Sequence, residues 1–203
     1  MATGICAVSL GLTLIRETFN AWTPTYLVDV YRLSQADAAQ KSSLFPLIGG
    51  FSVLVVGKLS DRMPPSRRLA LTVPMLALAA LALVLIGSAP IMASQTAGLT
   101  LLAAVAFLLL GPYSLLAGAM AVDLGGRRGS ATAAGLIDSA GYLGAVLSGW
   151  GVGALAERAG WATAFRALAG VAGAAVLAAL VYCSMPARLA SSSTTIAPTR
   201  GHG

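Results

Sequence analysis

The sequence predicts an all-α protein, a polytopic transmembrane helix bundle with six spans. The first reason is composition, because 57% of the 203 residues are hydrophobic and 10% are charged, whereas a soluble domain carries about 25% charged residues. The second is that apolar runs recur along the chain, and each is long enough to cross about 30 Å of hydrocarbon. The third is that basic residues gather in alternate loops, as they do on the cytoplasmic side of membrane proteins.

The apolar runs place the spans in order along the chain. The predicted spans are about residues 5–30, 37–57, 69–87, 96–123, 130–155 and 162–185. The first closes with Trp22, Tyr26 and Tyr31, which suit the aromatic belt at a membrane surface. Residues 1–185 are therefore expected to form one membrane domain. Residues 186–203 are rich in Ser, Thr, Ala and Pro and are expected to form a disordered cytoplasmic tail.

Polarity is unevenly shared among the spans. The third and sixth are almost wholly apolar and are predicted to face lipid, while the other four are predicted to line a cavity. Pro46 in the second span and Pro112 in the fourth are each expected to bend their helix, because proline lacks a backbone donor. The bend after Gly111 would place Tyr113 beside the cavity. The alternative is a kink that serves helix packing alone.

Loop charges assign the two sides of the membrane. The loops after the second and fourth spans, together with the tail, contain Lys58, Arg62, Arg67, Arg68, Arg127, Arg128, Arg188 and Arg200. The opposite loops contain fewer basic residues, and acidic residues offset them. The positive-inside rule predicts that the first set is cytoplasmic. With six spans, both termini are then cytoplasmic, and the protein is expected in the inner or plasma membrane.

Several classes of function find no support in the sequence. The net charge of +6 reports membrane topology and does not indicate nucleic-acid binding. Cys6 and Cys183 both fall in predicted spans and suggest no disulfide framework, and His202 is the single histidine. No nucleophile–base pair, metal-ligand cluster or nucleotide-binding loop is present in the sequence. We therefore expect no enzyme activity, no cofactor and no metal site.

Arg16 stands near the middle of the first span. A charged residue at the centre of a bilayer costs about 2.5–3.5 kcal/mol on insertion scales, so it normally faces protein or water and has a function. A polar stripe continues along the same helix face, formed by Ser9, Thr13, Arg16, Asn20 and Thr23. The stripe predicts the wall of an aqueous cavity in which Arg16 and Asn20 bind a solute. The alternative is that Arg16 pairs with Glu17 or Asp138 to lock helices together.

The fifth span carries a second polar face. Asp138 and Tyr142 lie on it, and Asp138 is expected about 12 Å deep by helical rise. A carboxyl group at that depth needs a partner, and Arg16 is the predicted one, so that an incoming anion displaces the carboxylate. A proton-coupling site and a static lock are the alternatives. Five glycines of this segment are predicted to allow close helix packing: Gly141, Gly144, Gly149, Gly151 and Gly153.

The turn after the second span runs Gly57-Lys58-Leu59-Ser60-Asp61-Arg62 and is followed by Arg67-Arg68. This charged motif resembles a loop of the major facilitator superfamily. Gly57 begins the motif and is predicted to permit close helix approach. Asp61 is predicted to pair with arginines as a conformational latch on the cytoplasmic face. The predicted members of the latch are Gly57, Asp61, Arg62, Arg67 and Arg68. The alternative is a basic loop that only sets topology.

Longer stretches resemble the organophosphate:phosphate antiporters of this superfamily. The segment from Arg16 to Leu27 resembles their seventh helix, Gly111-Pro112-Tyr113-Ser114 their tenth, and residues 131–144 their eleventh. The resemblance implies exchange of a phosphorylated metabolite, such as glycerol phosphate or a sugar phosphate, for inorganic phosphate by alternating access. It also implies that Arg16 is a phosphate ligand. Glu17 departs from the bacterial glycerol-phosphate pattern, where a tyrosine is usual, and this leaves the substrate open.

The resemblance covers only the C-terminal half of a twelve-helix transporter. Three explanations follow: a truncated product, a partner that supplies the N-terminal half, or a second copy of this chain. Self-association is geometrically allowed, because the two halves of such transporters share one topology. Other functions remain open as well: a proton-coupled porter of another small solute, a membrane sensor of sugar phosphates, or an assembly subunit without transport activity.

Overall fold

The structure is a computed structural model, and it describes residues 2–184 of the chain. Within that range the side chains of residues 2, 3, 65–67, 69, 70, 117, 124, 127 and 182–184 are excluded from the description. The predicted tail, residues 186–203, lies outside the described residues, so its predicted disorder stays a prediction.

The described part of the chain is helical apart from short connections and contains no strand, which confirms the all-α class. The α-helices are α1 (Ala2–Tyr31), α2 (Gln35–Ser42), α3 (Leu44–Asp61), α4 (Pro65–Ile86), α5 (Ala89–Met92), α6 (Gln95–Leu115), α7 (Ala121–Leu147) and α8 (Gly153–Ser184). Two π-helical turns join them, η1 (Leu116–Met120) between α6 and α7 and η2 (Ser148–Val152) between α7 and α8.

Two glycines reverse the chain direction inside the segments assigned as α7 and α8. Gly126 in α7 has φ 58° and Gly160 in α8 has φ 79°, a conformation that glycine adopts without steric penalty. Three helical stretches of the described residues are long and apolar enough to cross a membrane, namely Gln35–Asp61, Gln95–Asp123 and Arg128–Val181. The last has 54 residues and folds back at Gly160, and Leu71–Ile86 is a shorter apolar helix. The total of six spans stays a prediction.

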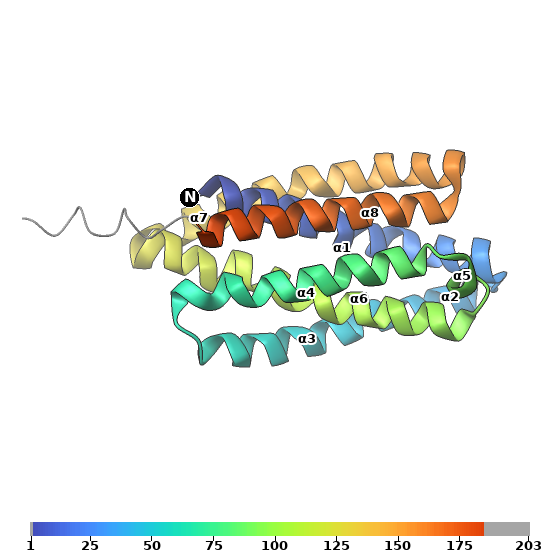
Figure 1. Cartoon of the computed structure of the whole chain (residues 1–203), viewed down its shortest axis with the longest axis horizontal. Coiled ribbons are helices and arrows are strands. Elements are labelled where there is room, and N and C mark those ends of the chain that lie inside the picture. Colours follow the sequence, from blue (N-terminus) through green and yellow to red (C-terminus); the bar gives the residue numbers. More distant parts are fainter. Residues whose placement is uncertain (1, 185–203) are drawn as a thin grey trace, which may run out of the picture.

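The helices lie side by side along the long axis of the molecule (Figure 1). Helix α1 packs against α7 and α8, α6 packs against α3 and α4, and α4 packs against α8. A direct contact between α1 and α6 joins the two groups. The core is centred on α1, whose Leu12, Ile15 and Leu27 are fully buried. Helices α4 and α8 lie on one side of the α1–α6 contact, and α3 and α7 lie on the other. Within the described residues, α3 and α7 share no extensive contact with each other.

The two ends of the bundle match the predicted grouping of loops. The N-terminal end of α1, the turn between α3 and α4, and the C-terminal end of α8 lie at one end (Figure 1). The short helices α2 and α5 lie at the other end (Figure 1). The basic turn after the second predicted span is therefore at the same end as both termini of the bundle. Which side of a membrane this end faces stays a prediction.

The bend predicted in the second span is present, but it lies slightly earlier than Pro46. Helix α2 ends at Ser42 and α3 begins at Leu44, with Ser43 between them. The ring of a proline clashes with the carbonyl of the residue four positions earlier, which here is Ser42. The amide of Ser43 accordingly donates to the carbonyl of Gln40 in a tightened final turn. The break therefore falls where Pro46 prevents a regular helix.

Close approach of α1 and α7 depends on two of the predicted glycines. A Cβ atom on Gly144 would collide with the carbonyl oxygen of Leu10, and one on Gly141 would lie 2.6 Å from Oγ1 of Thr13. Gly153 similarly leaves room for the indole of Trp22. The packing prediction is confirmed for these three glycines. It is wrong for Gly149 and Gly151, because a Cβ there would meet nothing within 4 Å.

Candidate functional site: an arginine between two helices

Arg16 and Tyr113 come together where α1 meets α6. The Arg16 guanidinium carbon lies 4.2 Å from the centroid of the Tyr113 ring. A cation over an aromatic face at this distance gains about 0.5–1 kcal/mol when exposed and more when desolvated. The Arg16 side chain is 26% exposed, so it is partly buried by protein and partly open. The structure thus joins two of the sequence-predicted site residues that are almost 100 positions apart.

The acidic partner of Arg16 is its neighbour Glu17. One terminal nitrogen of Arg16 lies 2.5 Å from Oε1 of Glu17, and the Glu17 side chain is 30% exposed. Successive residues on a helix point about 100° apart, so neighbouring side chains do not ordinarily face each other. Both side chains must therefore turn toward a common position to meet. Of the two partners weighed from the sequence, the structure selects the one on the same helix.

The guanidinium of Arg16 retains free hydrogen-bonding capacity. An arginine side chain carries five N–H donors. Nε of Arg16 is buried and has no hydrogen-bond partner among the described residues. A buried donor without a partner carries a penalty of about 1–3 kcal/mol, which a bound acceptor would remove. Together with the ring of Tyr113 on one face, this makes Arg16 a partly preformed site for an anion that carries two or more oxygens.

The predicted ion pair between Arg16 and Asp138 is wrong. Asp138 directly follows Ile137, whose carbonyl accepts a hydrogen bond from Ser9 on α1. Ser9 precedes Arg16 by seven residues, which is about 10 Å of helical rise. Asp138 is therefore offset along the bundle axis, and it has no ion-pair partner among the described side chains. Periodicity along the fifth span could not reveal this offset between helices.

The remaining predicted cavity residues are exposed and make no contact that would define a role. Asn20 is exposed one turn beyond Arg16 on α1. Tyr142 is 68% exposed on α7. No hydrogen bond within the described part of the chain connects either of them to Arg16. Their assignment to a substrate cavity stays a prediction.

The polar stripe predicted on α1 is open only in its middle. Ser9, Thr13 and Thr23 are buried, with exposed fractions of 1%, 2% and 3%. Ser9 donates across to α7, and Thr23 donates to the carbonyl of Phe19 on its own helix. The expectation that the whole stripe lines a cavity is therefore wrong. Helix α7 covers the N-terminal half of the stripe because Gly141 and Gly144 allow the two backbones to approach closely.

The charged turn at the end of α3 is arranged differently from the predicted latch. Nη1 of Arg68 donates to both carboxylate oxygens of Asp123 on α7, at 3.0 Å each. Asp61 and Arg62 are exposed, and Asp61 has no ion-pair partner in the described part of the chain. A Cβ atom on Gly57 would meet open space, so the close approach predicted there is wrong. The side chain of Arg67 lies outside the described residues.

Asp123 is the residue that the latch prediction missed. The sequence held one signal for it, since Asp123 is the one acidic residue between Asp61 and Asp138. It lies near the end of the fourth predicted span, where the arginines of the neighbouring basic turns need a counter-charge. The Pro64-Pro65 turn redirects the chain after α3, and α4 then presents Arg68 to α7. This ion pair links two helices that are far apart in the sequence.

We expect the Arg68–Asp123 pair to contribute a small, measurable coupling to stability. Both side chains are about one-fifth exposed, and pairs with this degree of solvent contact are worth roughly 0.2–1 kcal/mol. A double-mutant cycle with Arg68→Gln and Asp123→Asn, followed by thermal denaturation in detergent at low salt, would measure it. Arg62→Gln is the control, because Arg62 is exposed. Strictly additive effects would contradict the coupling.

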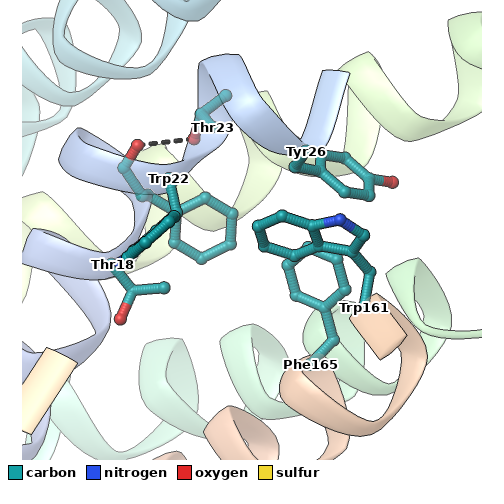
Figure 2. A pocket seen from close by; sticks show the side chains of 7 residues that line it. Thr18, Trp22, Thr23, Tyr26, Trp161 and Phe165 are labelled. Atoms are coloured by element: carbon teal, nitrogen blue, oxygen red, sulfur yellow. Dashed lines mark hydrogen bonds between the residues drawn. The ribbon is translucent and has the colours of Figure 1, made fainter. Parts of the chain in front are cut away.

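A separate small pocket lies between α1 and α8. Its lining is Thr18, Phe19, Trp22, Thr23, Tyr26, Trp161 and Phe165, and it encloses about 10 Å³, which is room for a single water molecule. Figure 2 shows the rings of Tyr26, Trp161 and Phe165 gathered on one side of it. The Tyr26 and Phe165 ring centroids are 4.9 Å apart. With no charged residue in its lining, this pocket serves aromatic packing and does not suit an anion.

The chain resembles proteins that are named as sugar-phosphate transporters. It is 32% identical over 162 residues to the glucose-6-phosphate exchanger SLC37A1 of Homo sapiens, covering 76% of this chain and 30% of that protein. It is 29% identical over 178 residues to a probable hexose phosphate transport protein of Chlamydia pneumoniae, covering 85% and 38%. It is 28% identical over 174 residues to sugar phosphate exchanger 3 of Bos taurus, covering 80% and 34%.

The family assignment follows from these matches together with the helical architecture. This chain spans about one third of the length of the curated relatives that it matches. The sequence profile described as the Major Facilitator Superfamily matches residues 1–149, which is more than half of the chain. The relatives are named as exchangers or as a transport protein. The chain belongs to the Major Facilitator Superfamily.

Proposed function

We propose that this protein takes part in the exchange of an organic phosphate for inorganic phosphate across a membrane, with Arg16 as the phosphate ligand. The substrate would be a sugar phosphate, by analogy with the names of its relatives, or a glycerol phosphate, as the sequence resemblance implies. Transport would proceed by alternating access, and no metal or cofactor is required for it.

The observation that carries the proposal is the environment of the Arg16 guanidinium, which has an aromatic ring on one face and a donor without a partner among the described residues. Its guanidinium lies against the ring of Tyr113, and its buried Nε has no partner within the described residues. A guanidinium presents a planar fork of donors that matches phosphate oxygens in a bidentate arrangement. Partial exposure of 26% leaves the group reachable from outside the packed core. These properties suit reversible binding of a phosphoryl group.

The proposal includes a second six-helix half. Twelve-helix transporters are built from two halves that share one topology, with the substrate between them. We propose that either an N-terminal half or a second copy of this chain faces Arg16 across the substrate site. The large exposed apolar side chains of α3, α7 and η2, such as Leu47, Leu54, Val146 and Trp150, would contact that partner or lipid. The basic end of the bundle would face the cytoplasm.

Exchange by the purified chain tests the proposal directly. Proteoliposomes that contain this chain alone, preloaded with inorganic phosphate, are expected to take up labelled phosphate. Arg16→Gln is expected to reduce uptake to the level of protein-free liposomes, because the variant lacks the cation. Arg166→Gln is the matched control, because Arg166 is an exposed arginine on α8 and is not part of the Arg16 site.

Three outcomes of the uptake experiment would each contradict a different part of the proposal. Equal uptake by wild type and Arg16→Gln would contradict the role of Arg16. No uptake by folded wild-type chain would contradict the version in which two copies suffice, and it would point to a separate N-terminal half. Uptake that follows the proton gradient and ignores internal phosphate would contradict exchange and favour a proton-coupled porter.

A further inference from the structure

We propose that Glu17 is the resident anion of the Arg16 site: it neutralises the guanidinium when the site is empty and yields its place to the phosphate group of an incoming substrate. This inference rests on the proposed function of Arg16. It assigns Glu17 a role in setting how tightly phosphate binds.

The geometry makes the Arg16–Glu17 pair easy to displace. Both partners belong to α1, so breaking the pair separates no helices. The Arg68–Asp123 pair is different, because it bridges α4 and α7 and its loss would loosen their contact. Glu17 is 30% exposed, and its carboxylate can therefore turn to solvent or to the partner half when released. Neighbouring side chains on a helix diverge by about 100°, which further favours release of the carboxylate.

Arg16 keeps its position when Glu17 leaves. The ring of Tyr113 lies 4.2 Å from the guanidinium carbon and holds one face of it. The nitrogen freed from Glu17 then becomes available as a donor, and the buried, unpartnered Nε joins it where the departure of the carboxylate uncovers it. Two donors from one guanidinium edge are what bidentate recognition of a phosphate requires. The site can therefore change anions with little rearrangement of the backbone.

The charges of the site explain why a carboxylate that competes with phosphate for Arg16 is useful. No other acidic or basic side chain of the described residues forms an ion pair with Arg16. Without Glu17, a bare and partly desolvated cation would face the substrate, and an anion held by it would leave slowly. A carboxylate that competes for the same donors weakens binding and accelerates release. An exchanger needs this property, because it must release one anion before it can bind the next.

Equilibrium dialysis of the purified chain with labelled inorganic phosphate tests the inference. We expect Glu17→Gln to bind phosphate roughly two- to fivefold more tightly than wild type, because a partly exposed ion pair no longer competes. Glu17→Asp, which keeps the charge, is expected to bind close to wild type. Glu157→Gln is the matched control, since Glu157 is exposed on α8 and its replacement changes the net charge equally.

A second readout does not depend on phosphate. Phenylglyoxal modifies accessible guanidinium groups, and mass spectrometry of the peptide that contains Arg16 gives the rate at that residue. We expect labelling of Arg16 to be severalfold faster in Glu17→Gln than in wild type or Glu157→Gln. An unchanged rate would overturn the inference, because it would mean that Glu17 does not occupy the guanidinium in the empty protein.

Arg16→Gln distinguishes failure of the inference from failure of the proposed function. If Arg16→Gln abolishes phosphate binding while Glu17→Gln binds no more tightly than wild type, Arg16 is the ligand and the role of Glu17 is overturned. If Arg16→Gln binds as well as wild type, the proposed function itself is overturned. Phosphate binding that appears only in Glu17→Gln would support both. Absence of binding in every folded variant would contradict the inference and the version of the proposed function in which two copies of this chain suffice.

Discussion

Replacing Arg16 by lysine is expected to reduce phosphate exchange by roughly 10- to 100-fold, although the positive charge is retained. The fold-change corresponds to the loss of about one hydrogen bond between charged groups. A lysine ammonium is a point charge without a planar fork, and it does not stack on an aromatic ring as a guanidinium does. Arg16 uses both properties, through its terminal nitrogens and through the ring of Tyr113.

The measurement is the initial rate of phosphate exchange in proteoliposomes over a range of phosphate concentrations. Arg166→Lys is the matched control, because the same change is made in an exposed arginine of α8. Exchange by Arg16→Lys at the wild-type rate would mean that the site needs only a cation. The bidentate arrangement proposed for the phosphate would then be wrong.

Gly144→Val is expected to have the largest effect on stability. The side chain of residue 144 would have to occupy the space of the Leu10 carbonyl oxygen, which belongs to the α1 backbone and cannot rotate away. Overpacking of a filled interior costs about 1–3 kcal/mol and occasionally more. Because α1 and α7 form the most extensive helix pair in the bundle, we expect a value at the upper end. A loss of about 3 kcal/mol lowers the melting temperature by about 6–12 °C.

Thermal denaturation of the purified protein in detergent measures this effect. Gly135→Val is the matched control, because Gly135 lies on the same helix and a Cβ there would meet nothing within 4 Å. Valine also has a better helix propensity than glycine, so the control is expected to be neutral or slightly stabilising. A melting temperature for Gly144→Val within 2 °C of the control would contradict the close α1–α7 contact.

Much of the secondary structure could be predicted because its signals are local. Apolar runs, the prolines and the glycine-rich turn near Gly126 depend on residues within a few positions of each other. The bend before Pro46 came one turn early for the same local reason, since proline acts on the residue four positions before it. The candidate site was predictable in part. Arg16 is conspicuous in an apolar helix, and Tyr113 follows the proline of the fourth span.

The ion-pair partner of Arg16 could not be predicted from the sequence, because it depends on how far one helix is shifted along another. The sequence alone made Arg16 a strong candidate and predicted Asp138 as its partner, with Glu17 as the alternative. The tertiary structure decided between them, because the hydrogen bond from Ser9 to Ile137 sets the axial register of α1 and α7 and leaves Asp138 about 10 Å from the level of Arg16.

For the charged turn and for the polar stripe as well, the sequence determined some features and the tertiary structure decided the others. The sequence determined that the protein is a helical membrane bundle, that basic residues gather at one end and that Arg16 needs a reason to be buried. Only the tertiary structure decided that Arg68 meets Asp123 and that α7 covers Ser9 and Thr13. Helical periodicity defines the faces of one helix, but the rotation and offset between two helices follow from how closely their small residues let the backbones approach.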